Sequence, residues 1–133
     1  MSCKPDGEGM AKDQVEAVKW YRKAAEQNFA KAQHNLGICY EQGEGVAKDQ
    51  VEAVKWFRKA AEQNYALAQN NLGVCFYNGD GVAKDWVEAY KWLLLPARQG
   101  NEDAKKNMTV LESKLTPEQI AEGQKRAREF KPR

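Results

Sequence analysis

The sequence predicts an all-α solenoid of stacked antiparallel helix pairs that ends in a C-terminal capping helix. The first observation is a repeat, because residues 11–46 and 47–82 align without a gap and differ at only nine of 36 positions. The second is that each copy holds two segments with the apolar spacing of an amphipathic helix. The third is that two short helices cannot bury their apolar faces alone, so consecutive copies must stack.

The repeat divides the chain into five predicted segments. A third copy begins at Ala83, keeps the phase and then departs from the pattern. The segments are 1–10 (the tail of a truncated repeat), 11–46 and 47–82 (full repeats), 83–115 (a degenerate terminal repeat) and 116–133 (a capping helix with its tail). On this interpretation, the layer of Leu36 and Cys39 is the least protected part of the stack.

The first helix of each repeat is predicted from its start signal. An aspartate stands at each expected N-cap and a glutamate three residues later, a spacing in which each side chain can reach an unpaired backbone amide. These pairs are Asp13 and Glu16, Asp49 and Glu52, and Asp85 and Glu88. Small and apolar residues then follow one stripe of the helix, which in the first copy consists of Ala17, Tyr21, Ala24 and Ala25. A stripe of mostly alanine predicts close approach of the neighbouring helices.

The second helix of each repeat carries a glycine in its interior. Its apolar stripe in the first copy consists of Ala32, Leu36, Cys39, Tyr40 and Gly43. Gly37 and Gly73 lie inside this helix in the two copies, where glycine costs roughly 1 kcal/mol relative to alanine. We therefore expect an adjacent helix to contact the backbone closely at both glycines. Gly43 suits the left-handed turn that ends a helix.

The third copy departs from the pattern before the chain ends in a last helix. Thr109 stands at the position of the helix glycine, Leu111 at that of the cysteine, and Pro96 where the first two copies have alanine. A proline inside a helix removes a backbone hydrogen bond, so we expect a kinked or shortened helix there. The sequence TPEQ at 116–119 offers an N-cap, a proline at the first helical position and a capping-box glutamine. A last helix is therefore predicted to run to about Phe130 and to expose a polar outer face.

The repeat pattern resembles that of the Sel1-like repeat family. The chain contains A-x-x-W-Y-x-x-A-A-E-Q, then A-x-x-N-L-G-x-x-Y and then G-x-G-V-x-K-D. The related tetratricopeptide repeats share several of these positions, but their 34-residue period does not fit. The resemblance implies a right-handed superhelix that acts as an adaptor or scaffold for other proteins, without catalysis of its own.

Composition excludes several classes of function. Lys and Arg total 21 against 19 acidic residues, with the two signs interspersed, so no nucleic-acid or anionic-membrane surface is indicated. The longest apolar run, residues 92–95, is far too short to span a membrane. We expect a soluble protein, and the lack of a leader together with three cysteines favours the cytoplasm. A periplasmic or secreted protein stays open if the N-terminus is truncated.

The sequence predicts no catalytic residue, no metal site and no cofactor. His34 is the only histidine, and Asn70 takes its place in the second copy, so we expect a surface histidine rather than a general base. Without a second histidine no zinc-ligand spacing is present. The Gly-x-Gly loops at 43–45 and 79–81 follow helices and lack the flanking Lys-Ser/Thr of a phosphate-binding loop. A small hydrolase remains the enzymatic alternative, and it would need clustered carboxyl groups with raised pKa values in a cleft.

The three cysteines occupy one position of the repeat. Cys3, Cys39 and Cys75 lie one period apart. Stacked repeats separate equivalent Cα atoms by about 10–20 Å, whereas a disulfide needs about 7 Å or less. We therefore expect small buried residues rather than disulfides or redox groups. A secreted subgroup of the family staples each helix pair with two cysteines per repeat, and this chain has one.

The candidate binding surface is a row of tryptophans with charged neighbours. Trp20, Trp56 and Trp92 occur once per repeat beside the apolar stripe of the first helix. The resemblance implies that first helices line the concave surface, and tryptophan is enriched at binding hot spots. Together with Lys19, Lys23, Lys55 and Lys59, this row predicts a groove of mixed charge that suits a protein or peptide partner better than a nucleic acid. Packing between adjacent repeats is the alternative role of the tryptophans.

A second candidate surface comes from the differences between the two copies. Lys31, His34 and Glu41 become Leu67, Asn70 and Tyr77, at positions that share one stripe of the second helix. We expect this stripe to face outward, either as a contact patch or as scattered surface residues. A structural fragment that self-associates weakly through an open N-terminal end is the third function considered; otherwise we expect a monomer.

Overall fold

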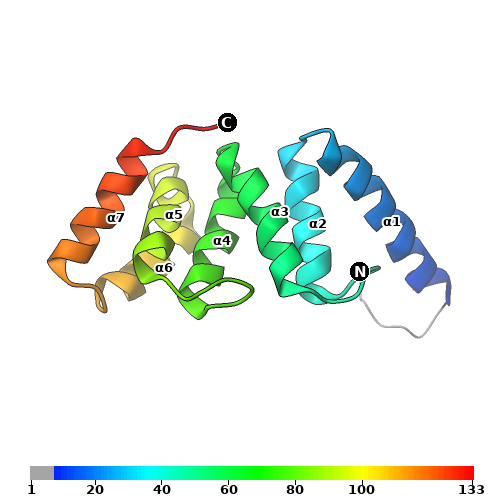
Figure 1. The fold of residues 1–133 in the computed structure, drawn as a ribbon, viewed down its shortest axis with the longest axis horizontal. Helices are drawn as coiled ribbons and strands as arrows, with labels where there is room; N and C mark the ends of the chain where they lie inside the picture. The colour runs from blue at the N-terminus through cyan, green and yellow to red at the C-terminus, as the bar shows by residue number, and fades with distance from the viewer. Residues whose placement is uncertain (1–7) are drawn as a thin grey trace.

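The computed structural model describes residues 8–133, and their side chains from Lys12 onward. This part of the chain forms seven helices and no strand: α1 (Glu8–Glu26), α2 (Ala30–Gln42), α3 (Gln50–Glu62), α4 (Ala66–Asn78), α5 (Trp86–Arg98), α6 (Glu102–Glu112) and α7 (Pro117–Glu129). From α1 to α6 each helix packs against the next one in the chain. Figure 1 shows these helices as a row of antiparallel pairs along the long axis. The predicted fold class is confirmed.

Two of the three predicted N-caps of the first helices are present. The side chains of Asp49 and Asp85 accept hydrogen bonds from the backbone N–H groups of Glu52 and Glu88, at 3.1 and 3.0 Å. The backbone N–H of each aspartate is also bonded to the second helix of the preceding repeat, at the carbonyl of Tyr40 or Phe76.

The prediction for Asp13 is wrong. α1 begins at Glu8, and Asp13 lies inside this helix. At Asp49 and Asp85 the backbone N–H donates to a carbonyl of the preceding second helix. The described residues place no second helix before Asp13. Of the predicted repeat tail, residues 8–10 are helical and continue into α1, and the rest, with Cys3, lies outside the described residues.

The glycines inside the second helices lie against side chains of the next repeat, as predicted. A Cβ atom built on Gly37 would lie 2.7 Å from the ring of Phe57 and 3.2 Å from the carbonyl oxygen of Ala53. At Gly73 it would lie 2.7 Å from Leu93. These contacts explain why α2 fits closely on α3 and α4 on α5.

The expectation that Pro96 shortens its helix is wrong. α5 ends at Arg98, which is the position in the repeat where α3 ends with Glu62. Pro96 stands in the last turn of the helix, where its carbonyl accepts the N–H groups of Gln99 and Asn101 at 3.0 Å each. Its ring is fully buried, so packing compensates for the missing N–H donor.

The core extends through the whole stack and opens at α1. Buried side chains of α3 to α7 form one large cluster, and those of α1 and α2 form a smaller one. The prediction that the Leu36 and Cys39 layer is the least protected is wrong, because Leu36 is completely buried. The open layer is the stripe of α1, where Ala17 and Tyr21 stay half-buried while their equivalents on α3 are fully buried.

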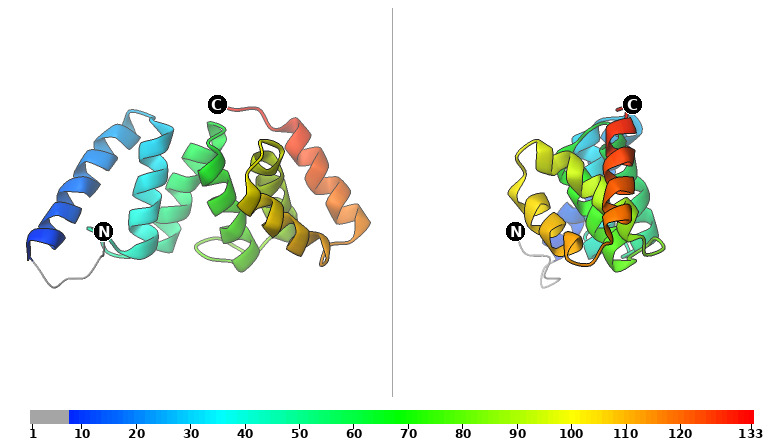
Figure 2. Two further views of the ribbon diagram at one scale, coloured as in Figure 1. Left: turned by 180° about the vertical axis from the view of Figure 1, so that it is seen from behind. Right: turned by 90° about the vertical axis from the view of Figure 1, so that its left-hand side faces the viewer.

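α7 is a capping helix, and its main contact is α5. Thr116 and Gln119 form a reciprocal capping box with Pro117 at the first position, and Phe130 is the C-cap, as predicted. A Cβ atom built on Gly123 would lie 2.6 Å from the ring of Tyr90 on α5. Figure 2 shows α7 lying across the end of the row, with the C-terminal tail turned back over the other helices. No helix of residues 8–133 is long and apolar enough to cross a membrane.

Candidate functional site

The three tryptophans differ strongly in exposure along the stack. Trp20 on α1 is 66% exposed, Trp56 on α3 is half-buried and Trp92 on α5 is 2% exposed. We call the surface of α1, α3 and α5 that carries these residues the tryptophan face. Trp56 is less exposed than Trp20 because it packs against the buried cluster of α1 and α2, and Trp92 is buried under Phe130.

The lysines predicted for the site divide into two groups. Lys23 lies over the ring of Trp20 with its Nζ 5.1 Å from the ring centroid, and Lys59 lies over that of Trp56 at 5.8 Å. Such cation–π contacts at exposed positions are worth about 0.5–1 kcal/mol.

The other two lysines pair with glutamates one helical turn away. Lys19 is 3.2 Å from Glu16 and Lys55 is 3.9 Å from Glu52. Exposed pairs of this kind contribute little stability, so these side chains can exchange partners at low cost. A shallow hollow of about 280 Å³ at α1 is lined by Trp20 together with Glu16, Lys19, Arg22, Lys23 and Glu26.

Trp92 is covered by the end of the chain itself. The rings of Phe130 and Trp92 meet nearly edge to face, with centroids 5.5 Å apart and planes at 71°. Lys91 lies over both rings, with its Nζ 4.3 Å from the Trp92 centroid and 6.0 Å from that of Phe130. Sequence reasoning placed Trp92 beside the other two tryptophans on an open surface, but Phe130 closes the face at this position.

The expected surface histidine is buried, which corrects the prediction. His34 is 6% exposed, its ring lies 5.8 Å from Phe57 and 5.4 Å from Tyr65, and its Nε2 is 2.9 Å from the Nδ2 of Asn71. Burial lowers the pKa of His34 below its usual value. The residue therefore packs between repeats 1 and 2 as a neutral side chain near pH 7.

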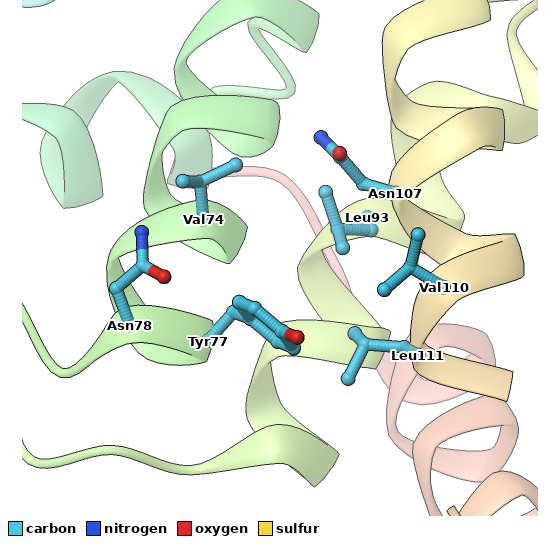
Figure 3. A pocket seen from close by; sticks show the side chains of 7 residues that line it. All are labelled: Val74, Tyr77, Asn78, Leu93, Asn107, Val110 and Leu111. Carbon is cyan, nitrogen blue, oxygen red and sulfur yellow. The ribbon is translucent and has the colours of Figure 1, made fainter. Parts of the chain in front are cut away.

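The second candidate surface is only partly outward. Leu67 is 51% exposed, but Asn70 is half-buried and accepts from Asn107 at 3.3 Å. Tyr77 is also half-buried and stacks on Trp86 at 5.8 Å. Tyr77 lines a cavity of about 230 Å³ between α4 and α6, together with Val74, Asn78, Leu93, Asn107, Val110 and Leu111. Figure 3 shows that Leu93 lies at the back of this cavity, between the side chains of the two second helices.

A ladder of amide side chains joins the repeats, and sequence reasoning missed it. The Oδ1 of Asn28 accepts from the Nε2 of Gln33 within its repeat and from that of Gln63 in the next, both at 3.2 Å. One period later Asn64 accepts from Gln69 and Gln99 in the same way, at 3.2 and 3.4 Å. The signal was present in the sequence, because both copies carry Gln-Asn after the first helix and a glutamine at the fourth position of the second helix.

Neither described cysteine is in a disulfide, and both are buried. Burial, together with the negative charges of Glu41 and Asp80, raises the pKa of Cys75 to about 12. Burial and the charge of Asp80 also raise the pKa of Glu41. Residues 8–133 contain no group of three or more His, Cys, Asp or Glu that could hold a metal ion.

The family follows from the match to a family model. The model described as the Sel1 repeat matches residues 6–29, 30–65 and 66–101, which make up most of the chain. The chain belongs to the Sel1 repeat family. The two complete Sel1 matches have the 36-residue period seen in the sequence, although they begin at the second helix of each pair. Sel1 repeat proteins generally bind other proteins as scaffolds and are typically non-catalytic.

Solved structures of Sel1 repeat proteins share the fold. A protective antigen of uropathogenic Escherichia coli with an SLR fold is 38% identical with a TM-score of 0.84, over 87% of this chain and 25% of that chain. A Sel1 repeat protein from Oxalobacter formigenes is 48% identical with a TM-score of 0.70, over 72% of this chain and 40% of that chain. Cysteine-rich protein B of Helicobacter pylori is 34% identical with a TM-score of 0.64, over 67% of both chains.

The Sel1 chain described above is short compared with the first two of these proteins. It spans about a quarter of the length of the antigen and two fifths of that of the Oxalobacter protein. No curated protein matches the sequence.

Proposed function

We propose that this chain is a protein-interaction module that binds a segment of a partner protein on the tryptophan face. The exposure of Trp20 carries the proposal, because a large apolar ring that is 66% exposed is available to contact a partner. Trp56 continues the same face at half exposure. Both rings lie beside lysines and glutamates of the first helices, which provide a surface of mixed charge.

The chemistry of the face suits a peptide chain better than a nucleic acid. Nucleic-acid binding requires an excess of cations along the surface, whereas Lys19 and Lys55 are each balanced by a glutamate. Tryptophan offers a large and rigid apolar contact at low cost in conformational entropy. An extended partner segment can place side chains on successive tryptophans while its polar groups remain in water.

A random peptide library displayed on phage tests the proposal. Peptides selected on the full chain should lose binding to the Trp20→Ala/Trp56→Ala double variant. They should retain it on Leu67→Ala/Val110→Ala, which removes two exposed apolar side chains of the second helices. Circular dichroism on heating verifies that both double variants stay folded. If the selected peptides bind all three proteins equally, the tryptophan face is not the site.

Self-association through α1 is a second candidate function. The stripe of α1 is incompletely covered, because Ala17 and Tyr21 are only half-buried while Ala53 and Phe57 on α3 are completely buried. Its equivalents on α3 lie against the preceding second helix, so the α1 stripe has the shape of a surface that packs on a helix. Sedimentation velocity over a hundredfold range of concentration tests this role. A monomer at every concentration contradicts it and leaves the peptide-binding proposal untouched.

A further inference from the structure

The last four residues of the chain lie along the tryptophan face. The ring of Phe130 packs on Trp92, and three residues later the backbone N–H of Arg133 donates to the carbonyl oxygen of Glu62 at 2.7 Å. The guanidinium of Arg133 is 4.0 Å from the carboxylate of Glu62. The tail therefore bridges the tryptophan of one repeat and the glutamate that ends the first helix of the preceding repeat. Figure 1 shows it running from α7 back toward the end of α3.

The chemistry of each contact explains the bridge. Phe130 and Trp92 meet nearly edge to face, which is a favoured geometry for an aromatic pair. Glu62 is the last residue of α3, where unpaired carbonyl groups and the negative end of the helix dipole favour a donor and a cation. An aromatic residue followed three positions later by a basic residue satisfies both contacts in an extended chain.

The same pair of residues occurs one period earlier. Trp56 and Glu26 stand in the repeat where Trp92 and Glu62 stand one unit later. Glu26 ends α1 as Glu62 ends α3. The amide ladder links the ends of successive first helices at both places, with Gln63 bonded to Asn28 and Gln99 to Asn64. The tryptophan and the glutamate that contact the tail therefore have counterparts one repeat earlier.

Trp56 and Glu26 are more accessible than Trp92 and Glu62. Glu26 is exposed, and Trp56 is half-buried with Lys59 over its ring. No aromatic ring of residues 12–133 packs on Trp56 as Phe130 packs on Trp92. Leu95 stands in the third repeat where Lys59 stands in the second, so an aromatic group on Trp56 must lie beside the stem of a lysine.

We propose that Trp56 and Glu26 form a binding site for an extended partner segment in which an aromatic residue is followed three positions later by Arg or Lys. This inference rests on the proposed function and names the chemistry of its partner. The chain's own tail has this pattern, F-K-P-R, but it occupies Trp92 because its tether to α7 gives it a high effective concentration there. The free partner segment is therefore expected at Trp56.

A labelled peptide tests the site. The probe is a synthetic peptide with the sequence AREFKPR of residues 127–133, carrying a fluorophore at its N-terminus, and the readout is its fluorescence anisotropy with the full chain. We expect saturable binding that weakens at least tenfold in Trp56→Ala. We expect it to weaken about two- to fivefold in Glu26→Gln. Glu118→Gln, which makes the same charge change at an exposed position of α7, should leave the affinity unchanged.

Substitutions in the peptide test the site without any change that could unfold the protein. Replacing its phenylalanine or its last arginine by alanine should each weaken binding to the unaltered protein, the phenylalanine more. Equal binding of all the peptides, or equal binding to Trp56→Ala, overturns the proposal. Absence of saturable binding up to millimolar concentration also overturns it.

The phage library separates this proposal from the proposed function. Selected peptides that lose binding to Trp20→Ala/Trp56→Ala but lack an aromatic residue three positions before a basic one would support the tryptophan face as a binding surface. They would contradict the specificity proposed for Trp56 and Glu26. Enrichment of that spacing supports both.

Discussion

Gly37 of α2 lies against the ring of Phe57 on α3, at a distance that leaves no room for a methyl group. Replacing Gly37 by alanine should destabilise the fold by about 1–3 kcal/mol, because overpacking outweighs the gain of roughly 1 kcal/mol in helix propensity. The measurement is the free energy of unfolding in urea. Thr109→Ala is the matched control, since Thr109 stands at the same repeat position on the exposed side of α6, and it should change stability by less than about 0.5 kcal/mol. A stabilised Gly37→Ala protein would contradict the close packing of α2 on α3.

His34 should make the stability depend on pH below about 6.5. Burial lowers the pKa of its side chain in the folded state below 6.5, so the unfolded chain binds a proton first as the pH falls. The contribution of the neutral ring is complete above pH 6.5 and is lost as the pH falls toward the folded pKa, by at most about 1.4 kcal/mol per pH unit.

The comparison of wild type with His34→Asn isolates this effect. Asparagine is the residue at the same position of the second copy. Urea unfolding at pH 7.5 and pH 5.0 should show a larger loss of stability for wild type than for the variant. Equal losses in both proteins would mean that His34 titrates in the folded state as it does in the unfolded chain.

The thiol of Cys75 should resist modification in the folded protein. Its pKa of about 12 keeps it protonated at pH 8, and burial blocks access to it. In a Cys3→Ser background, a thiol-reactive dye such as DTNB should react with less than one equivalent of thiol in the native state. In guanidinium chloride it should react with two equivalents, which are the thiols of Cys39 and Cys75. A rapid reaction of both thiols in the native state would contradict their burial.

Phe130 should stabilise the C-terminal end of the solenoid. Phe130→Ala removes a half-buried ring and its contact with Trp92, so the free energy of unfolding should fall by about 1–3 kcal/mol. Lys131→Ala, next to it in the exposed tail, is the control and should have little effect. If Phe130→Ala is as stable as this control, the tail does not lie on Trp92 in solution.

Much of the fold was predictable because the start and end signals of the helices occur in more than one copy of the repeat. The N-caps at Asp49 and Asp85, the close contact at Gly37 and the capping box at Thr116 all follow from local rules. Asp13 obeys the same sequence rule, but it lies inside α1, and residues 8–133 place no second helix before it. Local signals therefore predicted elements correctly where the adjoining repeat supplied their context.

The features that sequence reasoning missed depend on contacts between distant segments. His34 and Asn70 were interpreted as exposed because they differ, but each bonds to an asparagine of the next repeat, Asn71 or Asn107. Exchange of one hydrogen-bonding side chain for another is compatible with burial.

A glycine inside α7 indicated that this helix packs closely on another one. Gly123 lies in the middle of a helix, as Gly37 does, and it too marks a close contact, here with Tyr90. The same reasoning applied to Gly123 would have predicted a packed rather than a free face. It could not have identified α5 as the neighbour, because no repeat copy shows where a capping helix goes.

The contact between Tyr90 and Gly123 confines the capping helix to the last repeat, so repeats can be added before that repeat. α7 fits the last unit, where Tyr90 replaces the valine of the first two copies and Arg126 pairs with Glu88 at 2.7 Å. Inserting another copy of residues 47–82 before Ala83 would lengthen the row and leave this terminal joint intact. Gene duplication can thus change the number of tryptophan and glutamate sites without redesigning the end of the protein.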